Sequence, residues 1–229
     1  MTIHLRSSMQ TSNFDDLIDG SLSSSQRSNM YDDFLKRVLD VSLVVIAAAP
    51  VILLVIVLCV LISADGRSPF YWQRRVGRNG KVFKMWKLRS MVHDADSQLE
   101  AHLAADPLAR AEWDRSQKLR HDPRITRIGR LIRKTSLDEL PQLWNVFSGD
   151  MSLVGPRPMM PEQRKMYPGT AYYELRPGIT GLWQVSVRNE SSFAERAVFD
   201  TDYLHRVSIK TDILVLLRTV RVVFHGTGV

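Results

Sequence analysis

Two adjacent carboxylates, Asp138 and Glu139, are the residues of this sequence best suited to carry chemistry. They stand at the start of an apolar, helical pattern, so we expect them in the first turn of a helix over residues 136–147. Backbone N–H groups and the helix dipole favour anions there, so a phosphate would bind beside the carboxylates. A magnesium ion would neutralise the repulsion between them. The pattern Ser136-x-x-Glu139 also fits a capping box, which needs no function.

Arginines supply the second set of candidate ligands. Arg157 lies between two prolines, which restrict the backbone and would present its guanidinium group to a phosphate with little entropy to lose. Arginines spaced by three from Arg124 to Arg133 predict a basic face on a helix over residues 122–134. That face suits an anionic membrane surface or nucleic-acid phosphates, and a solvated face is the plain alternative.

The elements that must position these groups begin with an uncharged, apolar run of 22 residues, 41–62. As one helix it would rise roughly 33 Å, enough to cross a hydrocarbon core of about 30 Å. Pro50 removes a backbone hydrogen bond and predicts a kink. Basic residues lie before the run, at Lys36 and Arg37, and after it, from Arg67 onward, so the positive-inside rule draws both ends to the cytosol. A re-entrant helix satisfies both flanks; a single kinked span, or a buried soluble helix, is the alternative.

The rest of the chain has the pattern of a helix-rich domain. Residues 70–76 and 81–88 are rich in aromatic and β-branched side chains and flank Asn79-Gly80, which predicts a hairpin. The serine-rich residues 1–29 predict a disordered tail. Further predictions are helices over 94–118 with an interruption at 106–107, over 192–206 and over 208–224, a loop over 149–161, and a short strand over 182–187.

Composition bounds the classes of function. A net charge of +7, from 31 Lys+Arg against 24 Asp+Glu, indicates an anionic partner. The single cysteine, Cys59, excludes an internal disulfide and a cysteine zinc site. No helix-turn-helix, zinc-finger or RNP signature is present, so we expect no nucleic-acid partner. Asp-x-Asp triplets at 94–96 and 200–202 suggest a metal-dependent glycosyltransferase. The sequence lacks the repeated strand–helix alternation expected of the Rossmann-like fold of such enzymes, which argues against this class.

Several strings occur together and in order: KRVLD before the apolar run, FKMWKLRSM, DPRITRIGRLIRKTSLDELPQLWNVFSGDMSLVGPRP, and RPGITGLWQVSVRN. With them, residues 31–223 resemble the bacterial sugar transferase family, the monotopic polyprenyl-phosphate phosphoglycosyl transferases, in its short exopolysaccharide-initiating type. The resemblance implies an enzyme that transfers a hexose-1-phosphate, usually of galactose or glucose, from a UDP-sugar to undecaprenyl phosphate and releases UMP. Both substrates and membrane lipids are the expected partners; a homo-oligomer is left open.

The resulting fold class is an α-dominated α+β protein in three parts. Residues 1–29 form the disordered tail, 30–66 a re-entrant, Pro-kinked membrane helix, and 67–229 a small cytosolic catalytic domain with amphipathic interfacial helices and a short β-hairpin. The protein would lie in the bacterial inner membrane with that domain on the cytosolic face. The family usually carries Ser-Pro at the membrane break, where this chain has Ala49-Pro50.

The resemblance also implies roles for individual residues. Asp138 matches the family's nucleophile, which forms a covalent aspartyl-phosphosugar intermediate, and Glu139 matches the residue that binds Mg²⁺. Arg133 and Arg157 match phosphate-binding positions. Three more residues match positions that the family uses at its active site: Lys87, Arg188 and Asp212.

Two other functions stay open from the sequence. A non-catalytic, membrane-anchored adaptor would bind anionic lipid through the basic helix and release no nucleotide. An Asp-x-Asp glycosyltransferase would release UDP instead of UMP. The nucleotide released therefore discriminates all three hypotheses.

Overall fold

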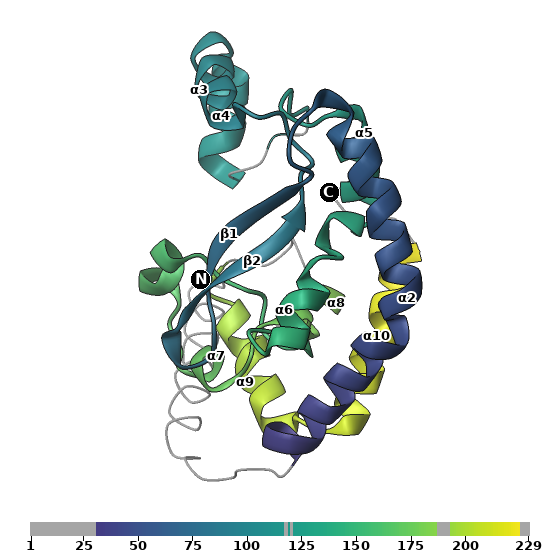
Figure 1. Cartoon of the computed structure of the whole chain (residues 1–229). Coiled ribbons are helices and arrows are strands. Elements are labelled where there is room, and N and C mark those ends of the chain that lie inside the picture. The colour runs from purple at the N-terminus through teal and green to yellow at the C-terminus, as the bar shows by residue number, and fades with distance from the viewer. Residues whose placement is uncertain (1–30, 117–118, 120, 187–192, 225–229) are drawn as a thin grey trace, which may run out of the picture.

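The structure is a computed structural model, and it describes residues 31–116, 119, 121–186 and 193–224. The tail predicted over residues 1–29 lies outside this part. Figure 1 shows one long helix, α2, curving along the side of a mostly helical domain with two short pairs of strands. The α-dominated fold with a short β-hairpin is therefore confirmed.

Helix α2 (Lys36–Ile62) follows a π-helical turn, Tyr31–Leu35, and runs for 27 residues. It continues through Pro50, so the proline lies within one helix and does not divide it. Among the described residues, α2 and the turn after it form the one helix long and apolar enough to cross a membrane. Its buried residues lie toward its two ends: Lys36, Asp40, Val44, Leu58 and Ile62. Because these positions recur every four residues within each end, each set faces the domain.

Both ends of α2 contribute to the core of the same domain. Near its start, Val44 packs in a buried cluster with Met85 and Val146. Near its end, Leu58 and Ile62 pack in a second cluster, together with Leu88 and Ile132. The helix is therefore fastened to the domain at both ends, while much of its middle is exposed.

The predicted hairpin is present. Strands β1 (Phe70–Val76) and β2 (Val82–Leu88) pair antiparallel, and the turn between them is a short 3-10 segment, Arg78–Gly80. Asn79 and Gly80 have φ of 57° and 74°, the left-handed region that the Asn-Gly pair tolerates best. The dipeptide was thus a correct signal for a tight turn.

The segment after the hairpin contains three helices. Helices α3 (Ala95–Ala105) and α4 (Pro107–Ser116) are separated at Asp106, as predicted, and project from one end of the molecule in Figure 1. Helix α5 (Arg127–Lys134) begins later than expected from the pattern over 122–134. Its N-cap is Thr126, whose side chain accepts a hydrogen bond from the Gly129 N–H at 2.8 Å.

A two-stranded parallel pair crosses the region predicted to be a loop. Strand β3 (Ser152–Val154) pairs with β4 (Gly178–Thr180), and residues predicted as a strand over 182–187 instead begin with helix α8 (Leu182–Val185). The loop prediction is confirmed for residues 155–160 but missed β3, and the strand predicted over 182–187 is wrong. The β3–β4 pairing depends on the close approach of distant backbones. A Cβ at Gly178 would lie 2.2 Å from the backbone nitrogen of Gly155.

The remaining helices complete the domain around these strands. They are α6 (Gln142–Ser148), a 3-10 segment (Pro161–Met166), α7 (Ala171–Glu174), α9 (Arg196–Arg206) and α10 (Ile209–Phe224). The two C-terminal helices were predicted in type and approximate extent. Helix α10 packs on the strand pair through Val215, which clusters with Val154 and Tyr203.

Candidate active site

The two carboxylates lie in a short 3-10 segment, Leu137–Glu139, and not in the first turn of an α-helix, since α6 begins at Gln142. Ser136 precedes this segment with φ 57° and makes no side-chain capping bond. The capping-box interpretation is therefore wrong. Capping does not explain why Asp138 is buried at this turn.

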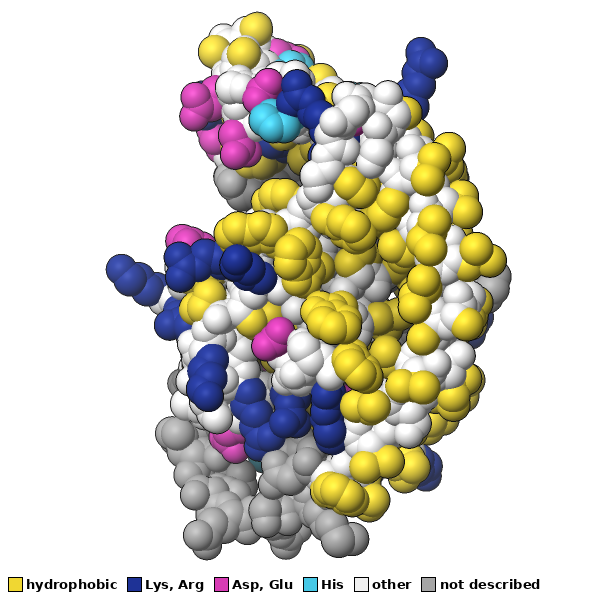
Figure 2. Space-filling view, viewed as in Figure 1, with side chains coloured by type: hydrophobic (Ala, Val, Ile, Leu, Met, Phe, Trp, Pro, Cys, Tyr) yellow, Lys and Arg dark blue, Asp and Glu magenta, His cyan; other side chains and the backbone are white. Residues whose placement is uncertain are grey.

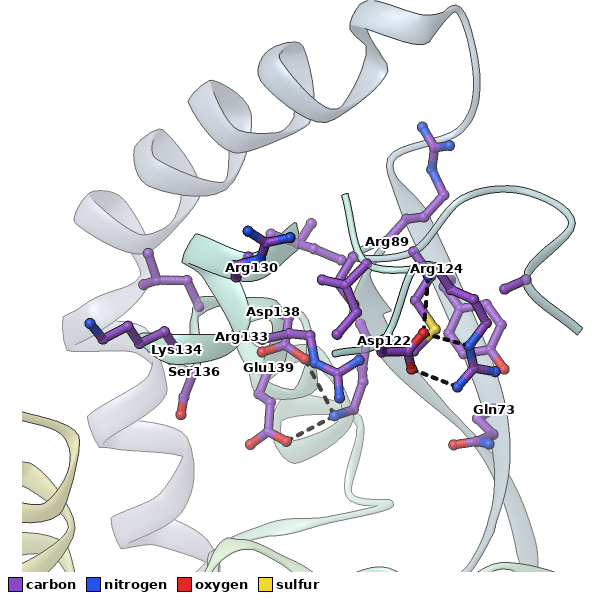
Figure 3. A pocket seen from close by; sticks show the side chains of 18 of the residues that line it. Gln73, Arg89, Asp122, Arg124, Arg130, Arg133, Lys134, Ser136, Asp138 and Glu139 are labelled. Carbon is purple, nitrogen blue, oxygen red and sulfur yellow. Dashed lines mark hydrogen bonds and ion pairs between the residues drawn. The ribbon is translucent and has the colours of Figure 1, made fainter. Parts of the chain in front are cut away.

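A lysine from strand β2 lies against both carboxylates. The Nζ atom of Lys87 is 2.8 Å from Glu139 Oε1 and 3.5 Å from Asp138 Oδ2 (Figure 3). The side chain of Asp138 is only 12% exposed. Burial raises the pKa of Asp138 above its ordinary value, while the positive charges of Lys87 and Arg133 oppose that rise. The result is a poorly hydrated carboxylate beside two cations that favour its ionised form, which suits a nucleophile.

Helix α5 brings further basic residues to the same cavity. Arg133 lies beside the dyad in Figure 3, and Arg130 and Lys134 also line the cavity. Arg124 does not join this basic face, contrary to the prediction. It precedes the helix and is buried, with Nε and Nη2 bonded to Asp122 at 2.8 and 2.7 Å.

The loop after β3 adds the predicted arginine, Arg157. Its side chain is exposed and lines the same cavity, with the guanidinium carbon 5.9 Å from the centroid of the Trp183 ring. Four separate chain segments therefore bring Lys87, Arg133, the dyad and Arg157 to one cavity. The cavity combines two carboxylates with several cations, an arrangement suited to phosphate chemistry.

Two more arginines line this cavity that the sequence patterns did not single out: Arg75 on β1 and Arg196 at the start of α9. The hairpin register contains a signal for the first. Tyr71 on β1 pairs with Lys87 on β2, so their side chains lie on the same face of the hairpin. Alternate residues of a strand share a face, so Arg75 lies on that face as well. No local pattern singles out Arg196, which arrives from more than fifty residues further along the chain than the dyad.

The last two predicted residues are not placed in this cavity. Arg188 lies outside the described residues. Asp212, on α10, is buried beneath the start of α2, where its carboxylate accepts hydrogen bonds from Lys36 at 2.6 Å, Tyr203 at 2.6 Å and Tyr31 at 2.9 Å. The structure therefore gives Asp212 a position that ties α2 to α10.

The acidic triplet at 200–202 does not form a pair of metal ligands. Asp200 is buried and accepts a hydrogen bond from the Tyr167 hydroxyl at 2.9 Å, whereas Asp202 pairs with Arg206 at 2.8 Å. Within the described ranges, no group of three or more His, Cys, Asp or Glu side chains gathers to hold a metal. The dyad does fit Mg²⁺, because that ion commonly takes one or two carboxylates and completes its shell with substrate phosphates and water.

Comparisons with known proteins identify the family to which the chain is similar. The family model described as "Bacterial sugar transferase" matches residues 31–226. The chain is 49% identical to the UDP-galactose-lipid carrier transferase of Erwinia amylovora and 47% identical to the undecaprenyl-phosphate galactose phosphotransferase of Salmonella typhimurium, in each case over 85% of this chain and 41% of the relative. It is 44% identical to the exopolysaccharide production protein ExoY of Sinorhizobium fredii, over 84% of this chain and 87% of that protein. The chain thus spans less than half of the first two relatives and most of the third.

Proposed function

The chain belongs to the bacterial sugar transferase family, and on that premise we propose that it transfers a hexose-1-phosphate from a UDP-sugar to undecaprenyl phosphate and releases UMP. The observation that carries the proposal is the buried Asp138 carboxylate, held beside Lys87 in a cavity with several cations. Relatives named for galactose and glucose phosphotransfer support either hexose as the sugar. Relatives named for exopolysaccharide production support a role in starting a polysaccharide repeat unit.

The first half of the proposed reaction forms a covalent intermediate. A carboxylate oxygen of Asp138 attacks the β-phosphorus of the UDP-sugar, and the bond from that phosphorus to the bridging oxygen breaks. The bridging oxygen keeps the electron pair and leaves as part of UMP. Asp138 then carries the sugar phosphate as an acyl phosphate. Lys87 and Arg133, whose charges favour an ionised Asp138, would offset charge on the transferred phosphate.

The second half returns Asp138 to its free state. A phosphate oxygen of the polyprenyl phosphate attacks the same phosphorus, and the bond to Asp138 breaks with its electron pair returning to the carboxylate. The acceptor is thereby joined to the sugar through a diphosphate. Mg²⁺, which the dyad and substrate phosphates would hold, would offset negative charge while the phosphates approach.

The position of α2 supports a membrane location for this site. Because both ends of α2 pack on the same domain, a course that enters and leaves one face of the bilayer fits better than a crossing. Figure 2 shows apolar side chains continuing from α2 across the neighbouring surface. Trp144 and Phe147, on helix α6 next to α2, are exposed. We therefore propose that the domain lies at the cytosolic face of the inner membrane, where the acceptor phosphate meets water.

Nucleotide release tests the proposal. Purified protein incubated with radiolabelled UDP-galactose or UDP-glucose and Mg²⁺, without lipid, should release UMP and retain labelled sugar on Asp138. Asp138→Asn should lose both signals. Asp202→Asn is the matched control, since that carboxylate lies in the alternative acidic triplet and pairs with Arg206. Release of UDP would support the other glycosyltransferase mechanism, and no release from any UDP-sugar would support the adaptor.

A further inference from the structure

Three arginines from separate elements line the cavity close enough to repel one another. Arg75 comes from β1, Arg157 from the loop after β3, and Arg196 from the start of α9. The guanidinium carbon of Arg196 lies 4.2 Å from the centroid of the Trp183 ring, and that of Arg157 lies 5.9 Å from the same ring. Two guanidinium groups therefore share one indole, which holds them close together. We call Arg75, Arg157 and Arg196 the arginine cluster.

The cluster has no ion-pair partner within the described ranges. Arg75 donates to neutral acceptors, the Pro158 carbonyl at 3.2 Å and the Gln73 side chain. The Nε–H groups of Arg75 and Arg196 are buried and donate to no acceptor in the described part of the chain. Buried donors without acceptors are costly, so the arrangement favours an anion that would satisfy them.

Electrostatics point the same way. Burial, followed by repulsion from Arg157, lowers the pKa of Arg75 to about 10 and that of Arg196 to about 10. Arginine is ordinarily so basic that this lowering marks a crowded and poorly compensated set of charges. A dianionic phosphate would relieve both the repulsion and the loss of hydration. Arg75 and Arg196 come from a strand and a helix, and two prolines restrict the loop backbone at Arg157, so the site is formed before the ligand arrives.

The cluster is distinct from the cations at the nucleophile. Lys87 and Arg133 act on Asp138, whereas the charge acting on Arg75 from the dyad is that of Glu139. Displacement at phosphorus is roughly in line, so the leaving oxygen departs on the side away from Asp138. In the second half-reaction the acceptor oxygen must approach Asp138-bound phosphorus from that same side. One phosphate subsite opposite the nucleophile would therefore be used twice.

We propose that the arginine cluster is this exchange subsite: it binds the phosphate of the departing nucleoside monophosphate and then, after that product leaves, the phosphate of the lipid acceptor. The inference rests on the two-step reaction proposed above. In the first step the bridging oxygen gains the electron pair of the broken bond, so the departing phosphate becomes a dianion as it meets the cluster. In the second step the acceptor's phosphate monoester brings the attacking oxygen to the same three guanidinium groups.

Arg→Lys substitutions test the subsite, because lysine keeps the charge and loses the bidentate fork. The variants are Arg75→Lys, Arg196→Lys and the more exposed Arg157→Lys. Arg164→Lys is the matched control: Arg164 also has a buried Nε without a partner in the described part of the chain and bonds the Gly80 carbonyl, but it does not line the cavity. Thermal unfolding of each variant in detergent identifies any that fail to fold.

Three measurements separate the outcomes. UMP binding is measured by calorimetry on the full chain in detergent, UMP release in a single turnover without lipid, and loss of the covalent label after addition of undecaprenyl phosphate. We expect each cluster variant to weaken UMP binding and slow both half-reactions by about 10- to 100-fold, the cost of lost charged hydrogen bonds, with Arg164→Lys unchanged.

Other results would overturn the inference. If folded cluster variants bind UMP as the wild type does and run both half-reactions normally, the arginines are not a phosphate site. If one half-reaction alone slows, the subsite is not shared. If the wild type releases no UMP but binds it in a cluster-dependent way, the proposed reaction fails while the phosphate site stands.

Discussion

Replacing Lys87 with methionine should move the pH dependence of covalent-intermediate formation. Lys87 Nζ lies 3.5 Å from Asp138 Oδ2 and 2.8 Å from Glu139 Oε1. At 3.5 Å and an effective dielectric constant of about 20, the attraction between Lys87 and Asp138 is about 5 kcal/mol. Methionine keeps much of the side-chain volume and removes this charge, so the pKa of the buried Asp138 must rise.

The magnitude follows from how much of that attraction is screened. The cavity is open and Arg133 remains nearby, so we expect the acid limb of the activity profile to move to higher pH by about 1 to 3 pH units. Since the nucleophile must be ionised, activity near neutral pH should fall about tenfold or more and recover partly at alkaline pH. A loss equal at every pH would instead indicate that Lys87 acts on the substrate phosphate alone.

The assay is single-turnover UMP release from the UDP-sugar donor without lipid acceptor, measured across a range of pH. Lys84→Met is the matched control, because Lys84 lies on the same strand but stacks 4.6 Å from the centroid of the Trp72 ring, outside the cavity. An unchanged acid limb in Lys87→Met would contradict the electrostatic role. So would an equal displacement in Lys84→Met.

Three other perturbations test the structure around this site. Asp212→Asn should lower the free energy of unfolding by about 3 to 5 kcal/mol, because it leaves Lys36 buried without its charge partner. If instead the melting temperature is unchanged and labelling of Asp138 is lost, the active-site role implied by the family resemblance is correct. Ser136→Gly should raise the free energy of unfolding by up to about 1 kcal/mol, since glycine adopts φ 57° without strain and no capping bond is lost, whereas Ser136→Val should lower it. Equal free energies of unfolding for the wild type and both variants in chemical denaturation would argue against strain at this turn. Burial raises the pKa of Asp200 to about 7, so the folded state retains a proton that an unfolded aspartate releases near pH 4. The free energy of unfolding should therefore fall by about 4 kcal/mol as pH rises from about 4 to about 7, and then level off. Asp200→Asn should flatten that dependence in thermal unfolding measured against pH, and a wild-type profile without this fall would refute the assignment.

Local patterns predicted the elements whose cause is itself local. The apolar composition of residues 41–62 predicted a helix of membrane-crossing length, and α2 contains it. Asn79-Gly80 predicted the hairpin because that pair tolerates left-handed backbone, and both residues adopt it. Asp106-Pro107 predicted the separation between α3 and α4, where Asp106 lies between the two helices.

Predictions failed where a distant segment competes with the local pattern. Ser136-x-x-Glu139 fits a capping box, yet the chain enters the turn with Ser136 in the left-handed region and Lys87 pairs with Glu139 instead. The basic spacing placed Arg124 on a helix, but Asp122 binds it before α5 begins. The parallel pair β3–β4 joins segments more than twenty residues apart, and no period in either segment reports the partner.

The amino-acid sequence alone determined which chemical groups are available: an aspartate–glutamate dyad, many arginines and one long apolar helix. It also determined the family, because the strings that carry the resemblance are read without any coordinates. Only the tertiary structure decided which groups meet. Arg75 and Arg196 line the cavity, whereas Asp212 lies beneath the start of α2 and outside it. Burial and convergence depend on contacts between residues remote in the chain, which the periodicity of a sequence cannot encode.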